Sequence, residues 1–317
     1  MGSSVNLRWS RVANLVPVLF GITLVSFLLL RLVPGDPAQQ ILGNRYTPEA
    51  AAGIRRTLGL DRPLLEQYWM FLKGAMTGSF GESYQYHRPV GELLLDRTGA
   101  SLMLVGLTAV FCAALSIPLG IWAAVRRGGL VDQATRVLFT LGFALPAFLV
   151  GIVLILVFGL TLGWAPIGGY GTGVASHLGH LVLPALTLAI PFSTVLVRSL
   201  RSSTITVLEA DFVTIARLKG ISESRILLRH VLRNAIGPVA VVFGINLAFL
   251  VGGTVVVENV FSIPGLGSLL VGAVSTRDYP VVQAVALVLA VFVVLVNLLT
   301  DVVHGLLDPR LAAGVQR

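Results

Sequence analysis

Six long apolar runs limit what this chain can fold into more than any other feature of its sequence. Each run is about 20 residues or longer, which is the length of α-helix that crosses the hydrocarbon core of a bilayer. Of the 317 residues, 55% are apolar and only 12% are charged, against about 25% charged residues in soluble globular chains. We therefore predict an all-α membrane protein with six transmembrane helices, over residues 12–33, 100–125, 137–163, 178–198, 236–257 and 281–305.

The first apolar run follows two basic residues, Arg8 and Arg11, as the apolar part of a signal peptide does. The run is longer than the 7–15 residues typical of a signal peptide, and no A-x-A cleavage pattern follows it. We interpret residues 12–33 as a retained first span.

The basic residues indicate the orientation in the membrane. The net charge of +8 comes from lysines and arginines that lie between the apolar runs, without the aromatic residues of a nucleic-acid groove. Short cytoplasmic loops are enriched in such residues, whereas long loops are exempt. With both termini in the cytoplasm, the short outer loops carry only Arg277. We expect this topology, contact with the lipid bilayer, and no nucleic-acid partner.

Two connections between the predicted spans are long. Residues 34–99 form the extracytoplasmic one, and residues 46–74 within it predict two short amphipathic helices with a break near residues 59–63. The cytoplasmic one covers residues 201–234. The expected organisation is an N-terminal segment with the first span (1–33), the extracytoplasmic segment (34–99), a core of five spans (100–305) and a cytoplasmic tail (306–317).

The cytoplasmic connection predicts a helix, a glycine turn and a second helix. Leu208, Phe212, Ile215 and Leu218 or Lys219 recur at helical spacing. Gly220 interrupts this pattern, after which Ser222 and Glu223 open a second helix that carries Arg225, Arg229 and Arg233 on one face.

Two interpretations of this connection are open. The helices could lie on the inner leaflet, with the arginines against anionic headgroups. Alternatively, the first helix could dock in a groove of a soluble partner through residues at i, i+3 and i+4.

The connection also resembles a known family. The stretch "DFVTIARLKGISESRILLRHVLRNAIGPV" (211–239) is similar to the loop that couples the permeases of binding-protein-dependent, ATP-driven importers to their ATPase subunits. The resemblance is closest to the B-type permeases of dipeptide, oligopeptide and nickel importers. It continues in order along nearly the whole chain, through "RLVPGDPA" (31–38), "LGLDRPLLEQY" (58–68), "NVFSIPGLGSLLVGAVSTRDYPVVQ" (259–283) and "LLDPRL" (306–311).

The resemblance implies a heteromeric ABC importer in which this chain supplies half of the pathway for peptides. The implied partners are a homologous C-type permease, two ATPase subunits and an extracytoplasmic substrate-binding protein. It also implies that the ATPase-coupling residues are Asp211, Phe212, Ile215, Ala216, Arg217, Lys219, Gly220, Ile221 and Ser222. The general loop has a glutamate six residues before its glycine, and here Thr214 stands in that place.

Motifs for catalysis and cofactor binding are missing from the sequence. Neither Lys73 nor Lys219 lies in the Gly-Lys-Ser/Thr context that cradles phosphate, so ATP and Mg²⁺ are expected on partner subunits and no cofactor on this chain. We predict no catalytic residues and no metal site, and we interpret His177 and His180, three apart, as incidental. The single cysteine, Cys112, lies in an apolar run and is interpreted as a packing residue.

The predicted outer end of the fifth span contains a carboxyl group and a bend. Glu258 precedes "NVFSIPGLG", where Pro264, Gly265 and Gly267 indicate a bent loop. By resemblance, these four residues would line or cover the outer mouth of the pathway; the alternative is a tight turn between two spans. Other functions also stay open: import of nickel chelates or haem, a secondary transporter driven by an ion gradient, and a membrane enzyme.

Overall fold

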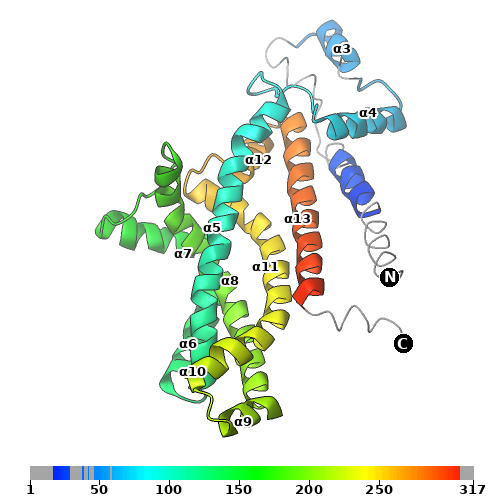
Figure 1. The fold of residues 1–317 in the computed structure, drawn as a ribbon. Helices are drawn as coiled ribbons and strands as arrows, with labels where there is room; N and C mark the ends of the chain where they lie inside the picture. Colours follow the sequence, from blue (N-terminus) through cyan, green and yellow to red (C-terminus); the bar gives the residue numbers. More distant parts are fainter. Residues whose placement is uncertain (1–16, 29–37, 39–41, 43–45, 58, 308–317) are drawn as a thin grey trace, which may run out of the picture. The chain divides into compact units, whose positions relative to one another are not determined.

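The computed structural model describes residues 17–28, 38, 42, 46–57 and 59–307 (Figure 1). The basic N-terminus and residues 308–317 of the tail lie outside this range. The described part is helical, and its only extended pairing is an isolated bridge between Glu82 and Pro89. Its named helices are α3 (Pro48–Thr57), α4 (Leu64–Thr77), α5 (Val90–Val125), α6 (Leu130–Ala144), α7 (Ala147–Leu154), η2 (Ile155–Thr161), α8 (Val174–Leu208), α9 (Asp211–Leu218), α10 (Glu223–Arg225), η3 (Ile226–Val231), α11 (Leu232–Val260), α12 (Leu266–Ser275) and α13 (Tyr279–Leu307).

Four helical stretches are long and apolar enough to cross a membrane. They are Val90–Val125, Val174–Leu208, Glu223–Val260 and Tyr279–Val302, and they overlap four of the six predicted runs. The first predicted run is represented by the shorter apolar helix Pro17–Leu28. The number of six spans therefore stays a prediction.

The predicted run 137–163 is broken near its start. Leu145 has extended backbone angles (φ −86°, ψ 131°) and ends α6, and Pro146 caps the start of α7. The break follows from local chemistry, because the pyrrolidine ring disfavours the helical conformation of the residue before it. The apolar helix after the break covers Ala147–Thr161 and ends in the π-helical turns of η2.

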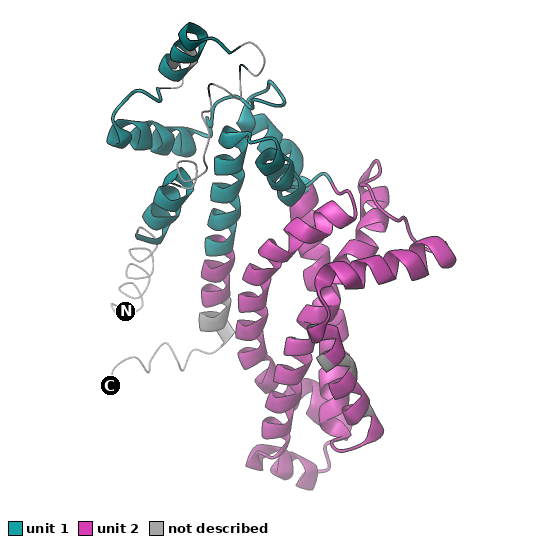
Figure 2. Ribbon diagram, turned by 180° about the vertical axis from the view of Figure 1, so that it is seen from behind, with its two compact units in different colours: residues 1–99, 264–294 teal, residues 100–263, 295–317 magenta. Residues whose placement is uncertain are grey.

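The chain divides into two compact units, and Figure 2 shows them in different colours. Unit 1 comprises residues 1–99 and 264–294, and unit 2 comprises residues 100–263 and 295–317. The division passes through α5 and α13, so each of these helices contributes one end to each unit.

Unit 1 contains the two helices predicted within residues 46–74, α3 and α4. Gly59, with φ 66°, lies in the break between them. α4 packs on the helix Pro17–Leu28, where the Tyr68 hydroxyl is 2.8 Å from Thr23 Oγ1 and the Tyr68 ring lies edge-on to Phe27. A second apolar cluster joins the start of α5 to α12 and α13; its buried members are Val90, Leu93, Leu94, Leu266, Leu269, Ala273, Val281, Ala284 and Val285.

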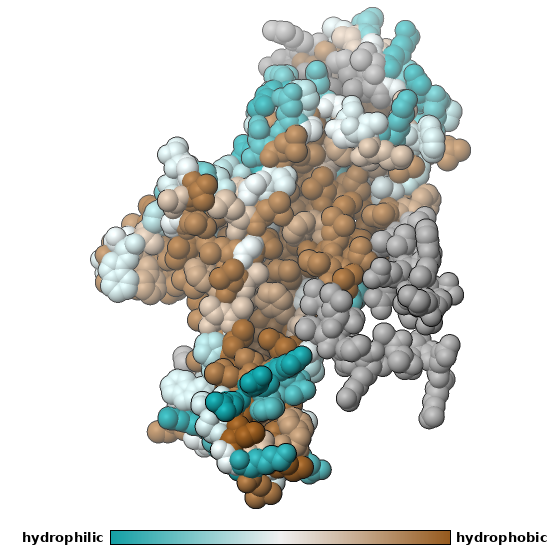
Figure 3. All heavy atoms as spheres, viewed as in Figure 1, coloured by the Kyte–Doolittle hydropathy of each residue, from teal (hydrophilic) through white to brown (hydrophobic). Residues whose placement is uncertain are grey.

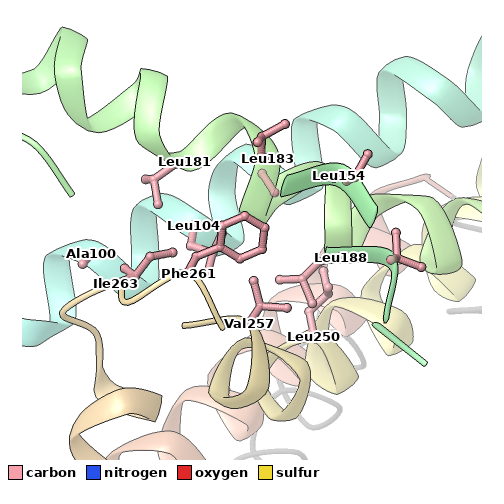
Figure 4. Close-up of a cluster of buried hydrophobic side chains, with 12 residues drawn as sticks. Ala100, Leu104, Leu154, Leu181, Leu183, Leu188, Leu250, Val257, Phe261 and Ile263 are labelled. Carbon is pink, nitrogen blue, oxygen red and sulfur yellow. The ribbon is translucent and has the colours of Figure 1, made fainter. Parts of the chain in front are cut away.

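The core of unit 2 forms where α5, α7, α8 and α11 meet (Figure 4). Phe261, in the turn after α11, is fully buried among Leu104, Leu181 and Leu188. A Cβ at Gly151 of α7 would lie 3.1 Å from the Phe261 ring, so the small residue permits the close approach of α7. A neighbouring cluster contains Cys112, a buried free cysteine that packs as the sequence suggested.

The surface of unit 2 changes from apolar to hydrophilic along the long helices. Figure 3 shows apolar residues over the middle of α5 and α11 and hydrophilic residues gathered around α9 and α10. α8 has 35 residues, a length of about 52 Å at 1.5 Å per residue, whereas the hydrocarbon core of a bilayer is about 30 Å thick. A substantial part of this helix therefore extends outside the apolar region.

Candidate functional site

The candidate coupling residues lie on α9 and in the turn that follows it. The extended backbone of Ala210 separates α9 from α8, and Asp211 in the first turn places a carboxylate near the positive end of the helix. The helix ends in a Schellman motif. The amide of Gly220 (φ 73°) donates to the carbonyl of Arg217 at 2.9 Å, and that of Ile221 donates to the carbonyl of Ala216 at 3.2 Å. The predicted helix and glycine turn are thus present.

α9 has one buried face and one exposed apolar face. Val213 and Ala216 pack in a small cluster with Ile226 and Val231. On the other face, Phe212, Ile215 and Leu218 are 43%, 51% and 83% exposed. Ala216 was among the candidate coupling residues, but its side chain points into the chain's own cluster. The apolar surface available to a partner is therefore the stripe formed by Phe212, Ile215 and Leu218.

The segment after the glycine turn differs from the predicted cap in one detail. Ser222 occupies the N-cap position, yet within the described residues its side chain makes no capping hydrogen bond. Its carbonyl accepts from the amide of Ile226 at 3.0 Å. Glu223 instead pairs with Arg217 at 2.7 Å, and this guanidinium lowers the pKa of the Glu223 carboxyl. The ion pair spans the turn and links the two helices at the surface.

A buried carboxylate on α6, that of Asp132, was not predicted from the sequence. Asp132, in the first turn of α6, is fully buried. Arg201 of α8 binds it with both prongs of its guanidinium, with Nε 2.7 Å from Oδ1 and Nη2 2.8 Å from Oδ2. Arg136 (2.6 Å) and the amide of Gly128 (3.0 Å) donate to Oδ2 as well. The hydrogen bonds from Arg136 and Arg201 hold the pKa of Asp132 well below its usual range.

No pattern in the sequence predicts this cluster, because Asp132 and Arg201 are 69 residues apart. The nearest hint was that an aspartate four residues before an arginine pairs with it on one helix face. That spacing identifies Arg136 as a partner and says nothing of Arg201.

The candidate outer residues fall into both units. In unit 2, Glu258 near the end of α11 is fully buried, and Ser101 of α5 donates a hydrogen bond of 2.6 Å to its carboxylate. In unit 1, the Gly265 amide donates to Ser268 Oγ at 3.1 Å at the start of α12, and Gly267 is buried in that helix. Pro264 immediately precedes this cap.

His177 and His180, which the sequence analysis interpreted as incidental, contact residues close to them in the sequence. The His177 ring stacks on Tyr170 with centroids 3.9 Å apart, and its Nδ1 is 2.7 Å from the Tyr170 carbonyl. His180 Nδ1 is 2.8 Å from the carbonyl of Ser176. Over the described part of the chain, no three His, Cys, Asp or Glu side chains gather where they could hold a metal ion.

With a long apolar helical core and a short helix exposed beyond it, the chain has the architecture of a membrane transport subunit, and comparison with known proteins identifies the family. Residues 116–313 match the model for the inner membrane component of binding-protein-dependent transport systems, and residues 6–105 match the model for the N-terminal part of such components. The chain belongs to this family of ABC transporter permeases, whose members are multi-pass proteins of the inner membrane.

Curated relatives match over almost the whole chain. A "Probable peptide ABC transporter permease protein" of Sinorhizobium fredii is 38% identical over 95% of this chain and 97% of its own length. The "Glutathione transport system permease protein" of Escherichia coli strain K12 is also 38% identical, with the same shares covered.

Solved structures support the fold. A chain of the MetNI methionine ABC transporter, in an inward-facing conformation, superposes with a TM-score of 0.56 over 68% of this chain and 96% of that chain. The sequence identity is 17%, so this likeness concerns the fold alone.

Proposed function

We propose that this chain is one of the two permease subunits of an ATP-driven importer of dipeptides or oligopeptides, and that it supplies half of the translocation pathway. The observation that carries the proposal is α9, a short helix held on a Schellman turn, with Phe212, Ile215 and Leu218 exposed on one face. The two relatives named for transport of a peptide and of glutathione support a peptide substrate.

The mechanism follows from this arrangement. Two ATPase subunits bind ATP and Mg²⁺ in the cytoplasm, and one of them receives α9 in a groove, as amphipathic helices are commonly bound. When the ATPases close, they displace α9 together with the ends of α8 and η3, against which its buried face packs through Val213 and Ala216. This displacement alternates access to the pathway between the two sides of the membrane. This chain binds no nucleotide in this scheme.

The remaining parts of the proposal concern topology and partners. Six spans place both termini, α9 and Gly220 in the cytoplasm. A C-type permease completes the pathway, and an extracytoplasmic binding protein delivers peptide to the outer side, where residues 34–99 and 259–280 offer docking surface. Glu258, Pro264, Gly265 and Gly267 belong to the outer part of the pathway.

The test combines co-purification with substitutions in α9. The chain is purified from its native membrane after mild solubilisation, and ATP hydrolysis by the recovered complex is measured with dialanine, trialanine and glutathione in the presence of the binding protein. We expect a second permease and ATPase subunits to be recovered. Phe212→Asp places a charge in the proposed contact and should lower peptide-stimulated hydrolysis by about tenfold or more, as loss of a buried aromatic anchor does. Gly220→Pro should have a similar effect, because proline cannot adopt the positive φ of Gly220.

A matched control is Leu228→Asp. Leu228 is also apolar and 67% exposed, but it lies on η3 rather than on α9, so this variant should keep most of the activity. Unchanged uptake by Phe212→Asp and Gly220→Pro in a normally assembled complex would refute the role of α9. A chain recovered without any ATPase, with uptake driven by an ion gradient, would instead identify a secondary transporter.

A further inference from the structure

The buried cluster around Asp132 includes a residue in the last turns of α8, the helix that precedes α9. A movement of α9 would pass through this part of α8 to the rest of unit 2. Arg201 is on α8, ten residues before the first residue of α9, and Asp132 is in the first turn of α6. Gly128, the third participant, belongs to the connection between α5 and α6 and has a φ of 80°. One carboxylate therefore joins three segments of the chain: the connection between α5 and α6, the start of α6 and the last turns of α8.

The geometry of the Arg201 contact fixes orientation as well as distance. The two prongs of the guanidinium meet the two oxygens of Asp132 at 2.7 and 2.8 Å. Such a bidentate pair resists rotation, which a single contact from a lysine would allow. The Asp132 carboxylate is fully buried and the Arg201 side chain is 21% exposed, so water competes little for this pair. A displacement of α8 at Arg201 must then carry α6 with it.

A second link joins the same segments closer to α9. Arg127, in the connection between α5 and α6, pairs at 2.8 Å with Glu209, two residues before α9 begins. Both side chains are more than half exposed, so this link is weak. Glu209 is the residue that follows α8 and lies eight residues after Arg201, a separation of about 12 Å along a helix. The last turns of α8 are thus tied strongly to α6 through Arg201 and Asp132, and the residue after α8 is tied weakly to the connection between α5 and α6 through Glu209 and Arg127.

We propose that Asp132 and Arg201 are positioning residues for energy coupling: their buried bidentate pair transmits the displacement of α9 through α8 to α5 and α6. This inference rests on the proposed function, since it requires that partner ATPases move α9. The inference adds a specific path by which the movement of α9 reaches α5 and α6, two helices that are not joined directly to α9.

The experiment compares two arginines that bind the same carboxylate. Arg201 bridges α8 and α6, whereas Arg136 binds Asp132 from within α6 and its side chain is 59% exposed. The complete complex carrying Arg201→Gln, Arg201→Lys or Arg136→Gln is reconstituted in liposomes with binding protein and dialanine. The measured quantity is the number of peptides imported per ATP hydrolysed, together with the rate of ATP hydrolysis and the yield of assembled complex.

We expect Arg201→Gln to assemble and hydrolyse ATP but to import about fivefold fewer peptides per ATP or worse, the lower end of typical couplings between sites. Arg201→Lys, which keeps the charge and loses the fork, should fall between this variant and the parent. Arg136→Gln should stay within about twofold of the parent, as expected for an exposed partner. A purely architectural role would reduce the yield of complex and leave the ratio of import to hydrolysis unchanged.

The outcomes separate the two proposals. If the parent complex neither imports dialanine, trialanine or glutathione nor hydrolyses ATP in response to them, the proposed function fails. If the parent is active and the Arg201 and Arg136 variants share one ratio, the coupling role of the pair is overturned. If Arg201→Gln does not assemble, Arg201→Lys serves for the comparison. If neither variant assembles, the pair has a structural role alone, and the inference is also overturned.

Discussion

Tyr84 lies outside the predicted spans, and the fold changes its ionisation. Burial raises its pKa to about 12, and the nearby Asp278 and Tyr279 add to the shift. Asp278 is itself buried in unit 1, where Ser83 Oγ and the amide of Gln85 donate to its Oδ2. The neutral phenol is therefore favoured in the folded chain. Its contribution to stability is present below about pH 10, the usual pKa of tyrosine, and is lost as the pH rises towards 12.

Tyr84→Phe gives a direct spectroscopic test. In a pH-jump titration of the detergent-solubilised chain, read before the fold is lost, the variant should lack one tyrosinate that forms near pH 12. Tyr46→Phe is the matched control, because Tyr46 is 43% exposed in the same unit. If the step missing from the Tyr84 variant lies near pH 10, the residue is exposed and the burial described here is wrong.

Residues were predictable from sequence where their role depends on near neighbours. Gly220 was recognisable because a glycine after an amphipathic stretch commonly ends a helix, and the φ of 73° confirms this. Asp132 was not, because its partner Arg201 is brought to it only by the packing of α6 on α8. The burial of Ala216 could not be predicted for the same reason: the cluster that buries it includes Ile226 and Val231 from beyond the turn.

Between elements, the closest approach in unit 2 that depends on a glycine joins α11 and α13. A Cβ at Gly244 would overlap the side chain of Thr300. Gly244→Ala should therefore destabilise the chain by about 1–3 kcal/mol through overpacking, measured as thermal unfolding in detergent. Thr300→Ala makes room for the methyl group, so the double variant should recover part of the loss in a double-mutant cycle.

Gly252→Ala provides the control on the same helix. A Cβ there meets none of the described atoms within 4 Å, so the substitution should be neutral or slightly stabilising because alanine favours the helix. Equal effects of the two substitutions would show that helix propensity, and not contact with Thr300, governs the change at Gly244.

Elements were predicted well where apolar length alone defines them. The long helices α5, α8, α11 and α13 coincide with four of the predicted runs because the bilayer demands about 20 apolar residues from each. The run 137–163 shows the limit of this rule. Its hydropathy is continuous, yet Pro146 divides it into α6 and α7 through the backbone of Leu145. Hydropathy averaged over a window of residues does not detect a constraint on the φ and ψ angles of a single residue such as Leu145.

For the molecule as a whole, the predicted topology places α9 in the cytoplasm and the turn between α12 and α13 outside. Two exposed positions, Ser222 and Thr276, test this after Cys112 has been replaced by alanine. In intact cells, a membrane-impermeant maleimide should label Thr276→Cys and leave Ser222→Cys unlabelled. Opening the membrane should make Ser222→Cys reactive. The reverse pattern would invert the orientation and exclude α9 as a contact for cytoplasmic ATPases.

The π-helical turn of η3, between α10 and α11, has a consequence for how such a chain tolerates insertions and deletions. A π-turn holds one residue more than the α-helix around it. Loss of one residue within Ile226–Val231 would let the turn revert to α-helix, and the segments on either side would keep nearly the same direction because the wider turn had absorbed the extra residue. Loss of one residue within the regular helix of α11 would instead rotate everything before it by about 100° and turn Phe212, Ile215 and Leu218 in a new direction. Deletions should therefore be tolerated better in η3 than in α11 among descendants of this gene.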